Sequence, residues 1–168
     1  FQKPGNGEAY RTALGRLLTS DLQFARATVN YVWKELFTLG LVEPADSFDL
    51  LRLDPEHLPP GWAAQPTHPA LLDRLARQLQ SDGFDLRKLM RLLTTSSAYQ
   101  LSSSYDGTWS EAYTPYFARH FVRRLGAEML YDAITKATAT PVSLPVNGYG
   151  APVAWAVQLP DVSEPGAR

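Results

Sequence analysis

Five polar side chains recur at every fourth position between residues 120 and 136, and their types could do acid–base chemistry. They are His120, Arg124, Glu128, Asp132 and Lys136. In a helix, side chains four residues apart lie above one another, so the row would be continuous. Glu128 and Asp132 could then approach the spacing of roughly 5 Å that retaining glycosidases use for their two carboxyl groups. Arg124 would lower the pKa of a neighbouring acid, however, which is the wrong direction for a proton donor.

Arg26 and Asn30 form a second polar pair with helical spacing, in a segment rich in aromatic residues. Asparagine is unfavourable in the middle of a helix, because its side chain competes for backbone hydrogen bonds. We therefore expect the Asn30 amide to bond another element, and we predict the row of Arg124 and Glu128 as its partner. A structural network between two helices is the preferred interpretation, since ion-pair networks occur without being active sites. A ligand site that includes Arg26, Asn30 and Arg124 is the alternative.

Two aromatic residues are candidates for a binding surface. Trp109 and Tyr113 lie in or beside the polar segment 99–111, which favours their exposure. Exposed aromatic rings stack on sugars or anchor a protein partner. We predict a binding role for both, whereas core packing is the simpler interpretation for Trp33.

The other common patterns of catalytic and metal-binding residues do not occur in the sequence. Without cysteine, the chain has no disulfide, no thiolate ligand and no C-x-x-C-H haem attachment site. Its three histidines, His57, His68 and His120, lie in different segments and form no H-E-x-x-H motif. No G-x-S-x-G or G-x-G-x-x-G motif occurs either. We expect no metal site and no cofactor, and a role other than catalysis.

Composition is that of an ordinary globular protein. The chain has 168 residues, of which 45% are hydrophobic and 20% charged, and this length suits one domain. Its net charge of −1 argues against nucleic-acid binding, which needs a basic surface. No apolar run approaches the roughly 20 residues that span a bilayer. We expect one domain over 1–160, with a linker or tail at 161–168, as a fragment or module of a longer protein.

Helical periodicity predicts five helices, and several have sequence signals at their ends. Asp85 is an N-cap candidate, Pro69 suits a first helical turn, and Gly40 offers a left-handed stop. The expected helices span 8–18, 23–39, from Pro69 up to Gly83, 86–98 and 114–138. The expected buried stripes of the third and fourth helices are Leu71, Leu72, Leu75, Ala76 and Leu79, and Leu89, Met90, Leu92 and Leu93. This pattern predicts a mainly α fold, an irregular bundle of about five helices.

Two further segments differ from this helical pattern. Residues 43–66 contain many prolines and several large apolar residues, which predicts a long loop packed by its own side chains and holding one short helical turn. Residues 141–158 alternate apolar and other residues on both sides of the turn at 147–150. This alternation predicts a C-terminal β-hairpin.

Several strings of the sequence resemble a planctomycete-type secreted-protein domain family, domain of unknown function 1553. The matching strings are 24–33, 36–42, 68–72, 85–96, 99–103, 123–128 and 132–134. Positions that recur in that family correspond here to Arg26, Asn30, Trp33, Arg124, Glu128 and Asp132. The resemblance covers about residues 11–160 and implies an exported location, beside other domains that include c-type cytochrome or carbohydrate-binding modules. It implies no established activity.

The sequence therefore favours a non-catalytic helical module that serves interaction or assembly within an exported multi-domain protein. Its expected partners are other domains or subunits of that assembly, a carbohydrate or a cytochrome. One alternative is a polysaccharide-acting enzyme domain, with Glu128 and Asp132 as its acid and base. Another is an accessory subunit that docks a c-type cytochrome or an electron-transfer complex.

Overall fold

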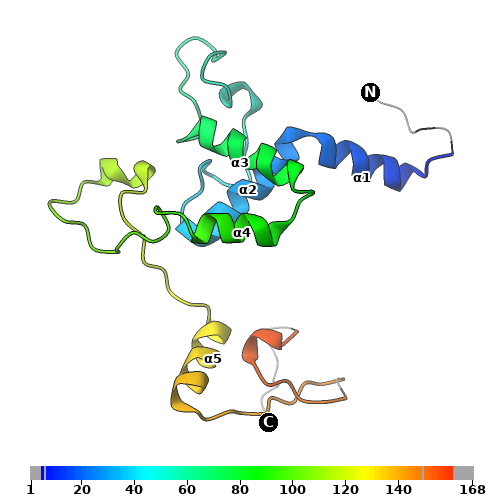
Figure 1. Cartoon of the computed structure of the whole chain (residues 1–168), viewed down its shortest axis with the longest axis vertical. Helices are drawn as coiled ribbons and strands as arrows, with labels where there is room; N and C mark the ends of the chain where they lie inside the picture. Colours follow the sequence, from blue (N-terminus) through cyan, green and yellow to red (C-terminus); the bar gives the residue numbers. More distant parts are fainter. Residues whose placement is uncertain (1–4, 6, 149, 161–168) are drawn as a thin grey trace. The chain divides into compact units, whose positions relative to one another are not determined.

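The computed structural model describes residues 5, 7–148 and 150–160, and it is mainly helical (Figure 1). The α-helices are α1 (Tyr10–Ser20), α2 (Leu22–Phe37), α3 (Pro69–Ser81), α4 (Leu86–Thr94) and α5 (Ala127–Thr138). Three short 3₁₀ helices accompany them: η1 (Leu50–Arg52), η2 (Glu111–Tyr116) and η3 (Ala156–Gln158). The mainly α prediction is confirmed. None of the helices in the described ranges is both long and apolar enough to span a membrane.

The chain forms two compact units, residues 1–122 and 123–168. The first holds α1 to α4 with η1 and η2, and the second holds α5 and η3. One domain over 1–160 stays a prediction, and the expected tail at 161–168 lies outside the described residues.

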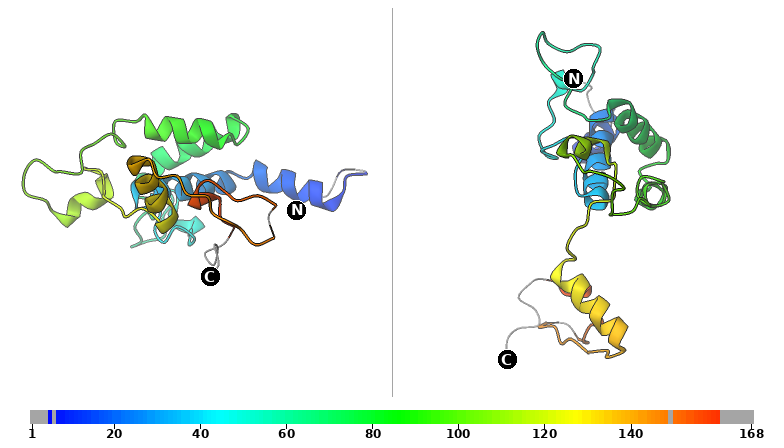
Figure 2. Two further views of the ribbon diagram at one scale, coloured as in Figure 1. Left: turned by 90° about the horizontal axis from the view of Figure 1, so that it is seen from below. Right: turned by 90° about the vertical axis from the view of Figure 1, so that its left-hand side faces the viewer.

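Helix α2 is the centre of the first unit. Asp21 caps its start by accepting a hydrogen bond of 2.8 Å from the backbone N–H of Gln23. The buried face of α2 packs against α3, α4, the chain that follows α2, and Phe117. The residues of this core are Val29, Trp33, Phe37, Leu41, Val42, Leu72, Leu75, Leu79, Leu89, Leu93 and Phe117. By contrast, α1 extends away from this core (Figures 1 and 2), and Ala13 is its one buried residue.

Helix ends follow the expected chemistry in two places and differ in a third. Pro69 opens α3, and the Asp85 carboxylate caps α4 by accepting from the backbone N–H groups of Arg87 and Lys88 at 3.0 and 3.1 Å. The left-handed residue after α2 is Thr38, with φ 76°, so the prediction that Gly40 provides this stop was wrong.

The loop between α2 and α3 projects from the helices (Figure 1) and is packed at several points. Ala45 and Leu53 are buried, and η1 is the short helical turn that was predicted. Gln65, near the end of the loop, is hydrogen-bonded to the start of the loop. Its side chain accepts from the N–H of Asp49 at 2.8 Å and donates to the carbonyl of Ser47 at 2.6 Å. The loop nevertheless exposes Leu50, Leu51 and Trp62.

The predicted helix 114–138 was wrong in its first half. Residues 111–116 form the 3₁₀ helix η2, with Pro115 inside it, and Phe117 then turns the chain with a left-handed φ of 50°. The chain stays irregular until Gly126, which precedes the first turn of α5. Helical spacing therefore does not apply between residues 117 and 126.

In the second unit, a short irregular segment folds back along α5. Leu144 and Val153 form one antiparallel bridge, with two hydrogen bonds of 2.9 Å. The predicted hairpin at 141–158 is reduced to this single bridge, because residues 156–158 form η3 rather than the end of a strand. The buried side chains here are Leu144, Val146 and Ala156, together with Thr135 of α5.

Candidate functional site

Arg26 forms a two-pronged ion pair with Asp73 that joins α2 to α3. Its Nε lies 2.7 Å from Oδ1 of Asp73, and its Nη2 lies 3.0 Å from Oδ2. This geometry is the strong form of an arginine–carboxylate pair. The Arg77 guanidinium reaches the same carboxylate only at 4.0 Å. The predicted binding role of Arg26 stays a prediction, and the bonds that the structure gives it are structural.

Asn30 is fully buried on α2 and bonds the backbone of Val42. Its Nδ2 donates to the carbonyl of Val42 at 3.0 Å, and its Oδ1 accepts from the N–H of Val42 at 2.9 Å. The side-chain amide thus forms the same pair of hydrogen bonds with Val42 that a residue of a neighbouring β-strand would form. The prediction that this amide bonds another element is confirmed, but the partner is the chain after α2 and not the row of Arg124 and Glu128.

Gly40 allows the chain to approach Asn30 closely. A Cβ atom added at Gly40 would lie 2.5 Å from the carbonyl oxygen of Val42 and 3.0 Å from Oδ1 of Asn30. Its N–H donates to Oε1 of Glu43 at 2.6 Å, and Oε2 of Glu43 pairs with Lys34 at 3.1 Å. Glycine at position 40 is therefore required by space rather than by its φ angle.

The predicted polar row from residue 120 to residue 136 does not exist as one helical face. His120 and Arg124 lie in the irregular segment before α5, whereas Glu128, Asp132 and Lys136 lie on α5 itself. The backbone N–H of His120 instead donates to the carbonyl of Ser102 at 3.0 Å. A spacing of four residues has no structural meaning where the backbone is not helical.

The two candidate catalytic carboxylates have different surroundings. Oδ1 and Oδ2 of Asp132 accept from the backbone N–H groups of Ala156 and Val157, at 2.6 and 3.1 Å. Asp132 therefore holds the start of η3 against α5. Glu128 is partly buried in the first turn of α5 and, among the described residues, makes no hydrogen bond or ion pair. An acid–base role for the pair stays a prediction.

Trp109 and Tyr113 belong to an aromatic cluster in the first unit. Tyr105 contacts both, with ring centroids 5.4 Å from Trp109 and 5.7 Å from Tyr113. The Arg119 guanidinium lies 4.1 Å from the Trp109 ring, a cation–π arrangement. The indole N–H of Trp109 also donates to Glu111 at 3.1 Å. Trp109 is consequently engaged within the cluster, and Tyr113 is the more exposed of the two predicted binding residues.

The histidines stay apart in space, as they do in sequence. His57 bonds Asp54 at 2.8 Å in the exposed loop, His68 packs edge-on against Tyr116, and the ring of His120 meets Tyr99. Across residues 7–148 and 150–160, no three His, Asp or Glu side chains are placed to share a metal ion.

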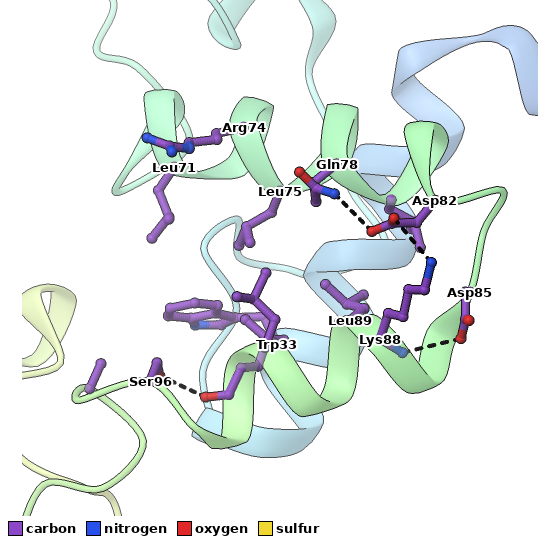
Figure 3. A pocket seen from close by; sticks show the side chains of 14 residues that line it. Trp33, Leu71, Arg74, Leu75, Gln78, Asp82, Asp85, Lys88, Leu89 and Ser96 are labelled. Carbon is purple, nitrogen blue, oxygen red and sulfur yellow. Dashed lines mark hydrogen bonds and ion pairs between the residues drawn. The ribbon is translucent and has the colours of Figure 1, made fainter.

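The first unit has a groove between α3 and α4, with a volume of about 590 Å³ (Figure 3). This volume is within the range of ligand sites, roughly 300–1,000 Å³. Apolar side chains dominate its lining, and they are Trp33, Leu71, Leu75, Leu79, Leu89, Leu92, Leu93 and Ala98. Trp33 reaches it from α2, so three helices contribute to the groove.

The groove was missed at the sequence level because its leucines were expected to be buried. Leu71 and Leu92, which line it, are 37% and 49% exposed. Met90, also expected inside, is 48% exposed but does not line the groove. An amphipathic stripe has the same sequence pattern whether it is covered or open, so no signal in the sequence could have distinguished the two.

One end of the groove is polar. The Gln78 amide donates to Oδ2 of Asp82 at 2.8 Å, and Nζ of Lys88 lies 3.4 Å from Oδ1 (Figure 3). The hydrogen bond from Gln78, together with the charge of Lys88, lowers the pKa of the Asp82 carboxyl below its ordinary value. This carboxylate is therefore ionised and paired. Arg74 also lines the groove and, in the described part of the chain, forms no hydrogen bond or ion pair.

Trp33 lines the groove from α2, and its indole nitrogen bonds no other atom of the described residues. Its side chain is 5% exposed, stacks on Phe37 at a centroid distance of 4.0 Å, and meets the edge of Phe117 at 5.2 Å. The indole Nε1 is buried and has no hydrogen-bond partner among the described residues. Unsatisfied buried donors are uncommon in proteins, and each calls for an explanation.

Comparison with known proteins gives one match. No curated protein and no solved structure matches the chain. A family model described as "Protein of unknown function (DUF1553)" matches residues 10–153, a range that reaches from α1 to the antiparallel bridge of the second unit. This chain therefore belongs to the DUF1553 family of proteins of unknown function.

Proposed function

We propose that this chain is a non-catalytic module that binds another polypeptide within a larger exported assembly, and that the groove between α3 and α4 is the binding surface. The observation that carries the proposal is the exposure of two leucines, Leu71 and Leu92, in a groove whose other apolar lining consists mainly of core residues. A concave and mostly apolar surface is typical of binding sites. The exported location rests on the family resemblance.

The engagement of the polar candidates supports the same proposal. Arg26 bonds Asp73, Asn30 bonds Val42, and Asp132 bonds the start of η3. Each contact holds two parts of the fold together. Side chains held in this way would have to break these bonds to bind a substrate, which argues against the alternative of an enzyme that acts on polysaccharides.

Purification of the full-length tagged protein from its native source, followed by quantitative mass spectrometry, tests the proposal. Leu92→Glu places a charge in the groove, and Met90→Glu places the same charge at an equally exposed position of α4 outside the groove. We expect at least one co-purifying polypeptide to be lost with Leu92→Glu and kept with Met90→Glu. Identical sets of polypeptides from both variants would refute the groove as the binding surface.

A further inference from the structure

We infer that the groove between α3 and α4 binds an amphipathic helix that presents large apolar side chains on one face and a carboxylate toward Arg74. The inference rests on the proposed function and adds the chemistry of the partner. Its basis is the arrangement around the groove of apolar rows, the unpaired charge of Arg74 and the unsatisfied indole N–H of Trp33, in the part of the chain that the structure describes.

The backbone around the groove favours a helical partner. The walls are α3 and α4, whose backbone groups are hydrogen-bonded within each helix, so the groove offers no strand edge. A segment bound there must satisfy its own backbone N–H and C=O groups. A helix does so, whereas an extended segment would bury unpaired groups against leucines.

The apolar side chains of the groove lie in rows on α3 and α4, and the exposed leucines among them are Leu71 and Leu92. The row on α3 is Leu71, Leu75 and Leu79, spaced by four, and the row on α4 includes Leu89 and Leu93. Rows with this spacing are the ridges against which another helix packs with its own side chains. Helix-in-groove recognition uses anchors at positions i, i+3, i+4 and i+7 of the bound segment.

The charges around the groove favour an acidic partner. Asp73 is paired with Arg26, and Asp85 caps α4. Asp82 is bonded to Gln78 and Lys88 at the polar end (Figure 3). The carboxylates of this helical hairpin are thus engaged, while the guanidinium of Arg74 is exposed and forms no ion pair in the described part of the chain. An acidic side chain on the partner would complement it and fix the orientation of the bound helix.

Trp33 adds a second, independent observation. Its side chain lines the groove, and its buried indole N–H has no hydrogen-bond partner among the described residues. The Nε1 atom is buried, so an oxygen atom of a bound segment would satisfy this donor only after the Trp33 ring turns out of its stack on Phe37. A purely hydrocarbon ligand could not do so, and the indole N–H resonance therefore reports the nature of the occupant.

The test uses the whole chain and three dye-labelled helical peptides of about 18 residues, roughly five helical turns. All three have the same composition of leucine and alanine; one has glutamate beside a leucine stripe, one has lysine in place of glutamate, and one has glutamate but a scrambled stripe. Fluorescence anisotropy measures the affinity of each. We expect the glutamate peptide to bind most tightly and the scrambled peptide to bind at least about tenfold more weakly.

Matched variants then separate the groove from the rest of the surface. Leu92→Glu should weaken binding of the glutamate peptide at least about tenfold, and Met90→Glu should not. Arg74→Glu should remove or reverse the preference for the glutamate peptide, a change of about fivefold for a partly exposed pair. Arg91→Glu, on α4 but outside the groove lining, should leave that preference intact. Circular-dichroism melting of each variant confirms that it is folded.

Nuclear magnetic resonance gives the last readout, a downfield shift of the Trp33 indole proton when the glutamate peptide binds. The inference is overturned if no peptide binds the wild-type chain, or if glutamate and lysine peptides bind equally. It is also overturned if the chain associates with itself through a contact that Leu92→Glu abolishes, because the occupant is then a second copy. The proposed function is tested separately, because it fails only if the polypeptides that co-purify from the native source do not depend on the groove.

Discussion

Asn30 and Val42 are joined by two hydrogen bonds in the buried interior of the first unit, one from the side-chain amide to the carbonyl and one from the backbone N–H to the side-chain oxygen. This pairing positions the chain that follows α2, including the core residues Leu41 and Val42. It explains an asparagine in the middle of a helix without any ligand. The polar residue here serves the fold.

Replacing Asn30 with alanine should lower the free energy of unfolding by about 2–4 kcal/mol, because it leaves the N–H and C=O of Val42 buried and unsatisfied. Urea-induced unfolding monitored by circular dichroism measures the change. Thr28→Ala is the control on the same helix, since the Thr28 hydroxyl bonds only the Phe24 carbonyl of its own helix; it should cost about 0.5 kcal/mol or less. A loss below about 0.5 kcal/mol for Asn30→Ala would contradict the structural role.

The same substitution at two glycines should have opposite effects. Gly40→Ala would force a Cβ atom against Val42 and Asn30 and should destabilise the chain by about 1–3 kcal/mol. Gly15→Ala, inside α1, meets no heavy atom within 4 Å and should stabilise it by about 0.5–1 kcal/mol through helix propensity. Thermal unfolding of both variants provides the comparison, and changes of equal sign would argue against close packing at Gly40.

The bidentate pair of Arg26 and Asp73 should contribute a coupling energy of about 1 kcal/mol, as expected for a well-oriented pair that is only partly exposed. A double-mutant cycle with alanine at both positions isolates this term from other losses. The pair of Arg77 and Asp73 uses the same carboxylate at 4.0 Å, and its cycle should give a coupling near zero. Equal coupling energies in the two cycles would mean that the 2.7 Å contact between Arg26 and Asp73 adds no stability beyond that of the longer Arg77 contact.

Asp82 should titrate below the ordinary aspartate pKa of about 3.9, because the Gln78 hydrogen bond and the Lys88 charge favour its ionised form. A lowered pKa in the folded state means that this carboxylate stabilises the fold above about pH 4 and loses that contribution as the pH falls through its folded value. Carbon-detected NMR titration of the Asp82 carboxyl measures the pKa. In Gln78→Leu the pKa should rise toward the ordinary value, and an unchanged pKa would show that Gln78 is not its cause.

Helices α2 to α4 were predictable to within a few residues because their starts have local causes. Asp21 and Asp85 cap α2 and α4, and Pro69 opens α3. The break before α5 has no such signal, since Pro115 suits a helix start and the left-handed turn at Phe117 is a tertiary effect. The regular spacing of His120 and Arg124 with the acids of α5 was therefore misleading.

The candidate site was predictable only in part. The low helix propensity of asparagine predicted that Asn30 needs a hydrogen-bond partner. The partner could not be predicted, because Asn30 bonds the backbone of Val42, and every residue except proline has the same backbone groups. The groove exists because α3 and α4 leave a space between them and because Leu71 and Leu92 are not covered by another element of the described chain. Neither is a local property of the chain.

Photo-cross-linking in the native source tests the central claim most directly. A benzoylphenylalanine at position 92 of the full-length protein probes the groove, and the same residue at position 90 probes the neighbouring surface of α4. The account predicts that position 92 captures a defined polypeptide, identified by mass spectrometry, and that position 90 does not. Equal products from both positions, or none from position 92, would contradict the account.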